Sequence, residues 1–457
     1  MRGKTSRRVA AGAALAGLAL LACEAVVPAA DIPERIETIP QLDVVLIVID
    51  TLRADWTTPY GFEKDTTPEL ASWAQRGVLF EQARAQSSWT KISMASMLTS
   101  LWPRSHGIRE AQDGLAEGAQ TLAEVLQQAG YQTFAVQTNG WLHQSFGFHQ
   151  GFDRYLFPAG ASGKIAPHEK PSLWTHADRV VEEAEHLIQT RDPDRPMFLY
   201  VHLMDVHEFA APPEFQVYGN DTAAMYQAAV RWSDDALRRI REALDAAGTL
   251  DRSVVVLASD HGETFGEHGI HGHARNVLTP SIHVPLVFRL PFAVAPLRIK
   301  SQVRNLDLAP TLLELAGVPS PSRFEGTSLL PLITSSSQGE DRPSYAALGF
   351  TLFRDASVQD ALTTGDWTYA RNAPAKENEP DDYTSRAVAP GGEFLFDRSV
   401  DPGEKVNLIE LEGARAAAMR GELEKHLAEA ELNDVKDEGV RIDPAIAGRL
   451  RAMGYLR

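Results

Sequence analysis

The stretch Asp43–Ile49 reads DVVLIVI, a continuous run of mostly β-branched apolar residues. Such a run is typical of a strand that is buried on both faces of a parallel sheet. Similar runs follow at residues 133–136, 197–203, 254–258 and 284–288, and helical patterns lie between them at 67–77, 121–129, 224–247 and 308–316. Alternating strands and helices predict an α/β fold, with a mostly parallel central sheet flanked by helices.

The chain changes character after this alternating part. The segment 335–341 (SSSQGED) is polar and interrupts the pattern, so we place a domain boundary there, between a catalytic domain over 41–334 and a subdomain over 342–432. Apolar runs at 362–369 and 394–396 and a helical pattern near 410–432 predict a small C-terminal α+β subdomain. Residues 433–457 are expected to form a tail with a last short helix over 443–457.

The first 22 residues have the pattern of an export signal. Four basic residues precede an apolar run over 9–22 that is too short to span a bilayer comfortably. Leu20–Cys23 (LLAC) resembles a bacterial lipobox, which predicts a lipoprotein signal peptide over 1–22 and a lipid anchor on Cys23. Residues 23–40 are then a linker, and the protein is expected to be extracytoplasmic and tethered to a membrane. A cleaved soluble signal or a plain anchor helix are the alternatives.

Composition excludes several classes of protein. The 457 residues include 44 Lys+Arg against 61 Asp+Glu, a formal net charge of −17, which argues against a nucleic-acid partner. The chain has one cysteine, so an internal disulfide, a cysteine-based zinc site and an iron–sulfur cluster are excluded.

Acidic residues follow two of the predicted strands. Asp50 comes directly after the first run, and Asp260 follows VVVLAS, with His261 next to it. Carboxyl ends of parallel strands collect functional groups, and carboxylate oxygens with an imidazole are plausible ligands of a divalent metal ion. Either acid alone would be read as a helix cap. The glycine-rich run over 259–269 (SDHGETFGEHG) favours a metal site instead.

A hydroxyl group is predicted at the start of a helix. Residues 87–100 (SSWTKISMASMLTS) read as a loop that continues into a helix, with Thr90 near its first turn. Backbone N–H groups and the helix dipole stabilise negative charge there, and a neighbouring metal ion lowers the pKa of a hydroxyl group. Thr90 is therefore a candidate nucleophile, although in isolation a helix cap is the simpler reading.

Six segments together resemble the sulfatase family of the alkaline phosphatase superfamily. They are LIVIDTLRADWTTPYG (46–61), SSWTKISMASMLTSLWPRSHG (87–107), GFHQGFDRY (147–155), FLYVHLMDVHE (198–208), VLASDHGETFGEHG (256–269) and FLFDRSVDPGEKVNL (394–408). They occur in the family's order over most of the chain, and the closing IAGRLRAMGYL is similar to the tail of bacterial relatives. The resemblance implies an alkaline-phosphatase-like sandwich and a metal-dependent hydrolase of sulfuric or phosphoric esters.

The resemblance also implies roles for single residues. A divalent metal ion (Ca, Mn, Mg or Zn) would be held by Asp50, Asp260, His261 and Thr90. Many sulfatases carry a second acid where this chain has Thr51. His207 and His273 would serve as catalytic residues next to the substrate, and His202 and Asn139 as substrate-binding residues. Asp205, His207 and His273 are an alternative set for a second metal ion.

The nucleophile position departs from the family pattern. Sulfatases carry Cys or Ser there, followed by Pro or Ala two residues later and Arg four residues later. This chain has Thr90, Ile92 and Met94, and Lys91 is a candidate to stand in for the arginine, with an exposed, solvated lysine as the alternative. Threonine cannot be converted to formylglycine, but it can attack phosphorus, which favours phosphate monoesters, diesters or phosphonates.

Three readings of function follow. The first is a hydrolase of a small-molecule, glycan or lipid ester that forms a covalent intermediate on Thr90. The second is a head-group transferase of the cell envelope, which resembles phosphoethanolamine transferases at this position. The third is an inactive envelope-binding homologue, which is disfavoured because Asp50, Asp260 and His261 are all retained.

Overall fold

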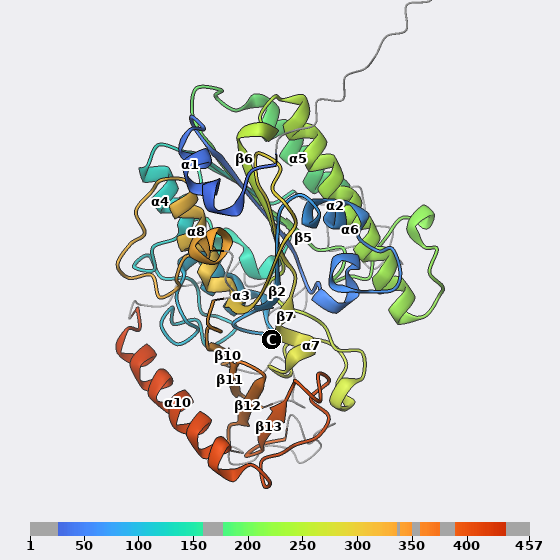
Figure 1. Ribbon diagram of the computed structural model, residues 1–457, viewed down its shortest axis with the longest axis vertical. Coiled ribbons are helices and arrows are strands. Elements are labelled where there is room, and N and C mark those ends of the chain that lie inside the picture. Colours follow the sequence, from blue (N-terminus) through green and yellow to red (C-terminus); the bar gives the residue numbers. More distant parts are fainter. Residues whose placement is uncertain (1–25, 159–176, 336–338, 350–356, 375–388, 436–457) are drawn as a thin grey trace, which may run out of the picture.

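The computed structural model describes residues 26–158, 177–335, 339–349, 357–374 and 389–435. Its centre is a nine-stranded sheet in the order β4-β3-β5-β1-β6-β8-β2-β7, with β9 paired to β2 (Figure 1). The strands are β1 (Asp43–Ile49), β2 (Val78–Arg84), β3 (Gln132–Val136), β4 (Arg154–Leu156), β5 (Met197–Leu203), β6 (Ser253–Ala258), β7 (His283–Val284), β8 (Leu286–Arg289) and β9 (Leu297–Arg304). The predicted mostly parallel sheet is confirmed, since β7 and β8 supply the antiparallel pairings.

Helices cover both faces of this sheet, as predicted. β1 is buried along its whole length, and its side chains alternate between two cores. Val44, Leu46 and Val48 join the core on the side of α3 (Thr90–Thr99), α4 (Leu122–Gln128) and α8 (Leu308–Leu315). Val45, Ile47 and Ile49 join the core on the side of α2 (Pro68–Ala74), α5 (Ala177–Thr190) and α6 (Thr222–Ala246) (Figure 1).

The strand register places the site. β1 pairs in parallel with β5 on one side and β6 on the other, with Ile49 opposite Leu203 and Val48 opposite Ala258. The carboxyl ends of these three strands therefore lie level with one another in the middle of the sheet. The residues that follow them emerge at one edge, close together.

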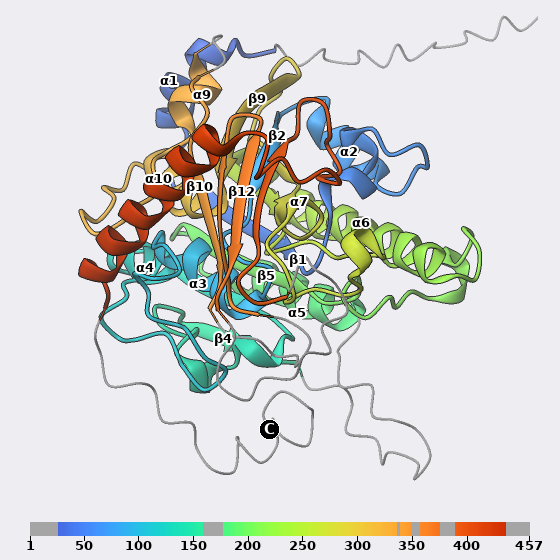
Figure 2. The ribbon, with the colours of Figure 1, turned by 90° about the horizontal axis from the view of Figure 1, so that it is seen from below.

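The C-terminal residues form the predicted second layer of α+β structure. A four-stranded antiparallel sheet has the order β10-β11-β12-β13. Its elements are β10 (Ser344–Leu348), β11 (Gln359–Thr364), β12 (Trp367–Asn372), β13 (Glu393–Asp397) and the covering helix α10 (Gly413–Leu432). Met419 and Leu423 of α10 pack on Leu362 and Leu395 of this sheet. β10 borders β9 of the main sheet, so the two sheets form one body (Figure 2).

Several expected elements differ from the structure for identifiable reasons. The run 284–288 is divided at Pro285 into β7 and β8, because proline cannot donate a hydrogen bond to a neighbouring strand. The run 362–369 is a hairpin rather than one strand, since Gly365, at a φ of 52°, turns the chain between β11 and β12. The short helices α7 (Thr279–Ile282) and α9 (Leu330–Thr334) were not predicted.

The N-terminal linker prediction needs correction for its described part. Residues 32–37 form α1, and Ile32 and Ile36 are buried in the main core. The Val27 backbone N–H donates to the Ala293 carbonyl, so this segment is fastened to the body because it carries apolar residues at helical spacing. The signal peptide, Cys23 and the tail helix over 443–457 lie outside the described residues. No described helix has the length and hydropathy needed to span a membrane.

Candidate active site

A tight, strained turn carries the chain away from β1. Thr51 has a φ of 59°, in the left-handed region that β-branched residues rarely adopt. The buried Tyr226 hydroxyl holds this turn by donating to the Thr51 carbonyl (2.8 Å) and accepting from the Arg53 N–H (3.0 Å). The Thr51 N–H donates to Asp260 Oδ1 at 3.2 Å. The turn thus joins the two strand ends that carry the acids.

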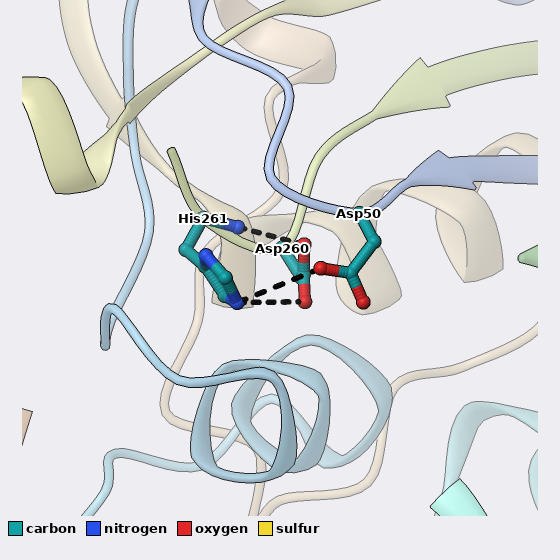
Figure 3. Close-up of side chains that lie close together, drawn as sticks. All are labelled: Asp50, Asp260 and His261. Carbon is teal, nitrogen blue, oxygen red and sulfur yellow. Dashed lines mark hydrogen bonds and ion pairs between the residues drawn. The ribbon is translucent and has the colours of Figure 1, made fainter. Parts of the chain in front are cut away.

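Asp50, Asp260 and His261 form a compact group that we call the cage (Figure 3). All three side chains are fully buried, and their potential ligand atoms lie within 4.8 Å of one another. His261 Nε2 is 3.4 Å from Asp260 Oδ2 and 3.7 Å from Asp50 Oδ1. Neither of these two carboxylate oxygens has a hydrogen-bond partner among the described residues. Buried oxygens left in this way are costly, and a divalent cation satisfies both, so the residues fit the predicted metal site.

The hydrogen bonds of His261 fix which nitrogen faces the cage. Nδ1 lies 2.9 Å from the Gly262 carbonyl oxygen, which can only accept a hydrogen bond. In the neutral ring Nδ1 therefore carries the proton, and Nε2 presents its lone pair to Asp50, Asp260 and Thr90. This is the protonation state that a metal ligand requires.

Asp50 is held from behind by a buried chain of hydrogen bonds. His202 Nε2 lies 3.0 Å from Asp50 Oδ2, and the Tyr200 hydroxyl lies 2.7 Å from His202 Nδ1. Burial alone would raise the pKa of Asp50, but the His202 hydrogen bond and the nearby histidines outweigh it and lower that pKa. Burial and the charge of Asp50 raise the pKa of Asp260. His202 is fully buried behind the carboxylate, so it positions Asp50, and its predicted substrate contact is wrong.

Thr90 is the first residue of α3 and lies at the cage. Its Oγ1 is 3.2 Å from His261 Nε2 and 3.4 Å from Asp50 Oδ2. All ten residues of α3 are buried, and the Ser93 hydroxyl, one turn later, donates to the Asp260 carbonyl. The predicted hydroxyl at a helix start is therefore placed against the predicted metal ligands by a helix that packing holds on all sides.

Asn139 also reaches the cage. Its Nδ2 donates to Asp50 Oδ2 at 2.8 Å and lies 3.4 Å from Thr90 Oγ1. Its Oδ1 accepts from the Trp141 N–H at 2.8 Å, which fixes the amide. The amide is thus beside the candidate nucleophile, where the sequence predicted a substrate-binding residue.

Lys91 does not take part in the site, and its predicted catalytic role is wrong. Consecutive residues of a helix point about 100° apart, so Lys91 faces away from the cage when Thr90 faces it. Its Nζ donates to the Ala111 carbonyl (2.8 Å) and lies 3.4 Å from the centre of the Phe146 ring. Burial holds the pKa of Lys91 well below its usual range. The missing arginine is not replaced by this residue.

His207 and His273 line the open side of the cage. The His273 ring centre is 4.8 Å from that of His261 and 4.8 Å from that of His207. Their side chains are 22% and 19% exposed, whereas the cage is fully buried. Burial alone would lower the pKa of His207, but its hydrogen bond with Glu208 and the charge of Asp50 raise it to about 9. These two histidines are therefore the partly exposed neighbours of the buried cage.

Asp205 has a structural role and, among the described residues, does not belong to a second metal site. Its Oδ1 accepts from the Ala177 N–H at the start of α5 and from Trp232 Nε1 of α6, both at 3.1 Å. It ties these two helices to the end of β5. Within the described ranges, the group with metal-ligand spacing is the cage, and Asp205, His207 and His273 do not form a second one.

Sequence reasoning missed two supporting residues. Glu263 Oε2 lies 3.0 Å from His273 Nδ1 and orients that ring, and Tyr200 orients His202. Burial alone would raise the pKa of Glu263, but the charge and hydrogen bond of His273 lower it. The position of Glu263 in the run SDHGE, two residues after His261, is the signal that points to it.

Comparisons with known proteins identify the family of the chain. A sequence model of the Sulfatase family matches residues 43–318. Arylsulfatase K of Rattus norvegicus is 23% identical over 85% of this chain and 78% of its own length. The ulvan-active sulfatase of Formosa agariphila is 23% identical over 82% of this chain and 80% of its own length.

A solved structure shares the fold. The phosphonate monoester hydrolase of Agrobacterium radiobacter superposes with a TM-score of 0.66 and 18% identity, over 86% of this chain and 96% of that protein. The family match spans more than half of the chain and includes every cage residue and Thr90. The chain belongs to the sulfatase family of the alkaline phosphatase superfamily and is an ester hydrolase of that family.

Proposed function

We propose that this protein is a metal-dependent hydrolase in which Thr90 is the nucleophile, and that phosphate or phosphonate esters are its preferred substrates. The observation that carries the proposal is the position of Thr90 Oγ1, 3.2 Å from His261 Nε2 and 3.4 Å from Asp50 Oδ2. Asp50, Asp260, His261 and Thr90 would hold the cation. When bound, a divalent cation supplies positive charge that lowers the pKa of the hydroxyl and offsets negative charge on the ester.

The protein residues account for the covalent steps. Thr90 Oγ1 attacks phosphorus, its proton passes toward Asp50 Oδ2, and the bond from phosphorus to the leaving oxygen breaks. His207 donates a proton to that oxygen, since its raised pKa keeps it protonated at neutral pH. Water then attacks phosphorus and gives a proton to His207, the bond to Thr90 Oγ1 breaks, and the proton held at Asp50 returns to the threonine. Asn139 Nδ2 donates toward Thr90 Oγ1 throughout.

The chemistry of threonine supports the preference for phosphorus. Sulfatases with formylglycine use a hydrated aldehyde, which carries a second hydroxyl on the same carbon. Thr90 has no second hydroxyl and can only release its product by attack of water on the esterified atom. The Agrobacterium protein is named for hydrolysis of a phosphonate monoester, and the Formosa protein is named as a sulfatase active on ulvan. We therefore expect a small phosphorus ester or one carried by a glycan or lipid, and treat sulfate esters as the competing class.

Two measurements test the nucleophile and the substrate class. The purified protein is assayed with aryl phosphate, bis-aryl phosphate, aryl phosphonate and aryl sulfate in Mn²⁺, Ca²⁺ or Zn²⁺. We expect turnover of a phosphorus ester, a loss of at least about 10³-fold in Thr90→Ala, and partial activity in Thr90→Ser. Thr99→Ala is the matched control, because it removes a buried hydroxyl from the other end of the same helix.

Mass spectrometry of the tryptic peptide 85–91 (AQSSWTK) after acid quenching should detect a phosphorylated threonine and no aldehyde. A preference for aryl sulfate by several orders of magnitude, or an active Thr90→Ala, contradicts the proposal.

We also propose that Cys23 carries a lipid that holds the catalytic body on an extracytoplasmic membrane face. The LLAC motif and the basic, apolar N-terminus support this. Partition of the protein into detergent, lost in Cys23→Ser, is the expected result. A Cys23→Ser protein that partitions like wild type argues for a different form of attachment.

A further inference from the structure

A cavity lies between the main sheet and the C-terminal sheet. Its volume is about 660 Å³, within the range of small-molecule sites. The lining comes from β2, β9, the turn between β11 and β12, and the loop after β13; its basic members include Arg84, Lys300, Arg398 and Lys405. None of the cage residues in the described part of the chain lines it. We call it the subdomain cavity.

Arg84 is the unusual residue of this cavity. Its side chain is 1% exposed, yet only one hydrogen bond holds it, from Nη2 to Gln82 Oε1 at 2.8 Å. Its Nε and Nη1 have no hydrogen-bond partner, and no carboxylate in the described ranges lies within ion-pair distance. A buried guanidinium without a counterion is costly, because a buried charge is normally paired.

A second guanidinium borders the same space. Arg398 donates through Nη2 to the Gly365 carbonyl, but its Nε also has no hydrogen-bond partner in the described chain. Burial and the charge of Arg398 both lower the pKa of Arg84, so the two groups repel each other across the cavity. The charge of Glu404 acts on Arg84 in the opposite direction and raises its pKa. Glu404 is buried outside the lining, and its Oε2 accepts from the Thr279 N–H at 2.8 Å. Among the described residues, the whole lining has five Arg or Lys and five Asp or Glu side chains, so it carries no net excess of positive charge, and the unpaired positive charge is local to Arg84.

We propose that the subdomain cavity binds an oxyanion of the sulfate, phosphate or carboxylate class between Arg84 and Arg398. Guanidinium N–H groups form strong, charge-assisted hydrogen bonds to the oxygens of such an anion. Arg84 Nη2 is already bonded to Gln82, and the free Nε and Nη1 lie on opposite sides of the guanidinium, so an anion between the two arginines accepts from one of them and from Arg398 Nε. The ion is either free in solution or a charged group on a saccharide, since the cavity exceeds the size of an inorganic ion.

The cavity is linked to the active-site loop. Arg53 also lines it, and Arg53 Nη1 donates to the Glu263 carbonyl at 3.0 Å. The Glu263 carboxylate in turn holds His273. Binding in the subdomain cavity can thus be measured separately from turnover at Thr90. The cavity is nevertheless connected to His273 through Arg53 and Glu263.

Titration calorimetry and thermal denaturation test the site. The purified protein is titrated with sodium sulfate, sodium phosphate and sodium acetate, with sodium chloride at equal ionic strength as the baseline. We expect wild type to bind one more equivalent of sulfate than Arg84→Met, and its Tm to rise with the logarithm of sulfate concentration. Arg84→Met should have an unchanged or higher Tm in sulfate-free buffer, because it removes an unpaired buried charge at similar volume.

Two further variants make the result decisive. Arg238→Met is the matched control, because Arg238 lies on α6 and is already paired with Asp235 and Glu242; it should keep the full sulfate response. Arg398→Gln should weaken sulfate binding by at least tenfold, and it answers the question if Arg84→Met fails to fold. Equal sulfate stoichiometry and affinity in wild type, Arg84→Met and Arg398→Gln overturns the proposal. The proposal is also overturned if Arg84→Met and Glu404→Gln lower the Tm equally and neither wild type nor variant responds to sulfate. That result indicates a structural ion pair between Arg84 and Glu404.

A competition experiment between a sulfated sugar and inorganic sulfate identifies the source of the anion. If 6-sulfated glucosamine binds at least tenfold more tightly than inorganic sulfate, the site takes a charged group of a saccharide, and equal affinity indicates a free ion. Failure of the catalytic proposal is read separately, from turnover and from Thr90→Ala. An inactive protein that loses one sulfate equivalent on Arg84→Met still supports the subdomain cavity.

Discussion

Removing one hydroxyl group, in Tyr200→Phe, should weaken metal binding without touching a metal ligand. The Tyr200 hydroxyl donates to His202 Nδ1 at 2.7 Å, and His202 Nε2 donates to Asp50 Oδ2 at 3.0 Å, with all three side chains buried. Without the hydroxyl, His202 Nδ1 is a buried acceptor with no partner. If the proton moves to Nδ1 instead, the lone pair of Nε2 faces the Asp50 carboxylate. Either arrangement disfavours the Asp50 geometry that the cage requires.

The size of the effect follows from that single lost bond. A buried polar group left unsatisfied costs about 1–3 kcal/mol. If the cost falls on the metal-bound arrangement, the Kd for Mn²⁺ rises about 5- to 150-fold, since about 1.4 kcal/mol corresponds to tenfold. Calorimetric titration of the metal-free protein with Mn²⁺ measures this directly, and kcat/KM should fall by a comparable factor.

Tyr155→Phe is the matched control for this prediction. Tyr155 lies on β4, which β3 separates from the strand of Tyr200, and its hydroxyl donates to the Leu142 carbonyl, away from the cage. Both variants should lose thermal stability, but Tyr155→Phe should keep the Mn²⁺ affinity within about twofold. If Tyr200→Phe lowers the Tm and leaves the Mn²⁺ Kd unchanged, the buried chain does not position Asp50 and the reasoning is refuted.

Four other outcomes follow from the structure. Chelation of the metal should lower the Tm of wild type and leave that of Asp260→Asn unchanged, because the variant has lost a ligand; at 100 times the Kd, the metal contributes about 2.7 kcal/mol to unfolding free energy. Burial lowers the pKa of His106 to about 3, so the neutral ring favours folding above pH 6.5, and that contribution is lost as pH falls toward 3. His106→Asn keeps an acceptor for the Ile108 N–H (3.2 Å), and its stability relative to wild type should rise by about 2 kcal/mol between pH 6.5 and pH 5; parallel Tm–pH curves would contradict this. Thr51→Gly should match or exceed the wild-type Tm, whereas Thr51→Val should lower it, because the φ of 59° suits glycine. Lys91→Met should keep kcat within about threefold of wild type. A hundredfold loss would show that Lys91 takes part in catalysis.

The sequence was sufficient to predict the main layer of the fold and the grouping of Asp50, Asp260 and His261. Asp50 and Asp260 follow strands whose patterns are unambiguous, and the carboxyl ends of parallel strands coincide once the sheet forms. Thr90 was identifiable because it lies near a predicted helix start and falls at the nucleophile position of the family that the segment resembles. These features depend on local pattern, on that resemblance and on one general rule of sheet geometry.

The remaining features depend on packing that local pattern does not encode. Lys91 was misassigned because one step along a helix rotates a side chain out of the site. His202 was misassigned because a buried strand residue can face a ligand from behind as well as a substrate from in front. Glu263 and Tyr200 act through other residues, and such contacts are decided by loop conformations and by side chains far away in sequence.

The cage joins parts of the chain that are distant from each other. The Thr51 N–H and Asp260 Oδ1 that meet at 3.2 Å are separated by 209 positions, and His207, Asn139 and Thr90 all lie between them in the sequence. The unfolded chain has no local segment that offers this combination of ligands, so selective metal binding begins only after the central strands have paired. A nascent or partly unfolded chain should therefore carry no metal in this site. If the cage holds a cation as proposed, that ion would be acquired in the compartment where folding is completed, and the metal content of the isolated protein would reflect that compartment.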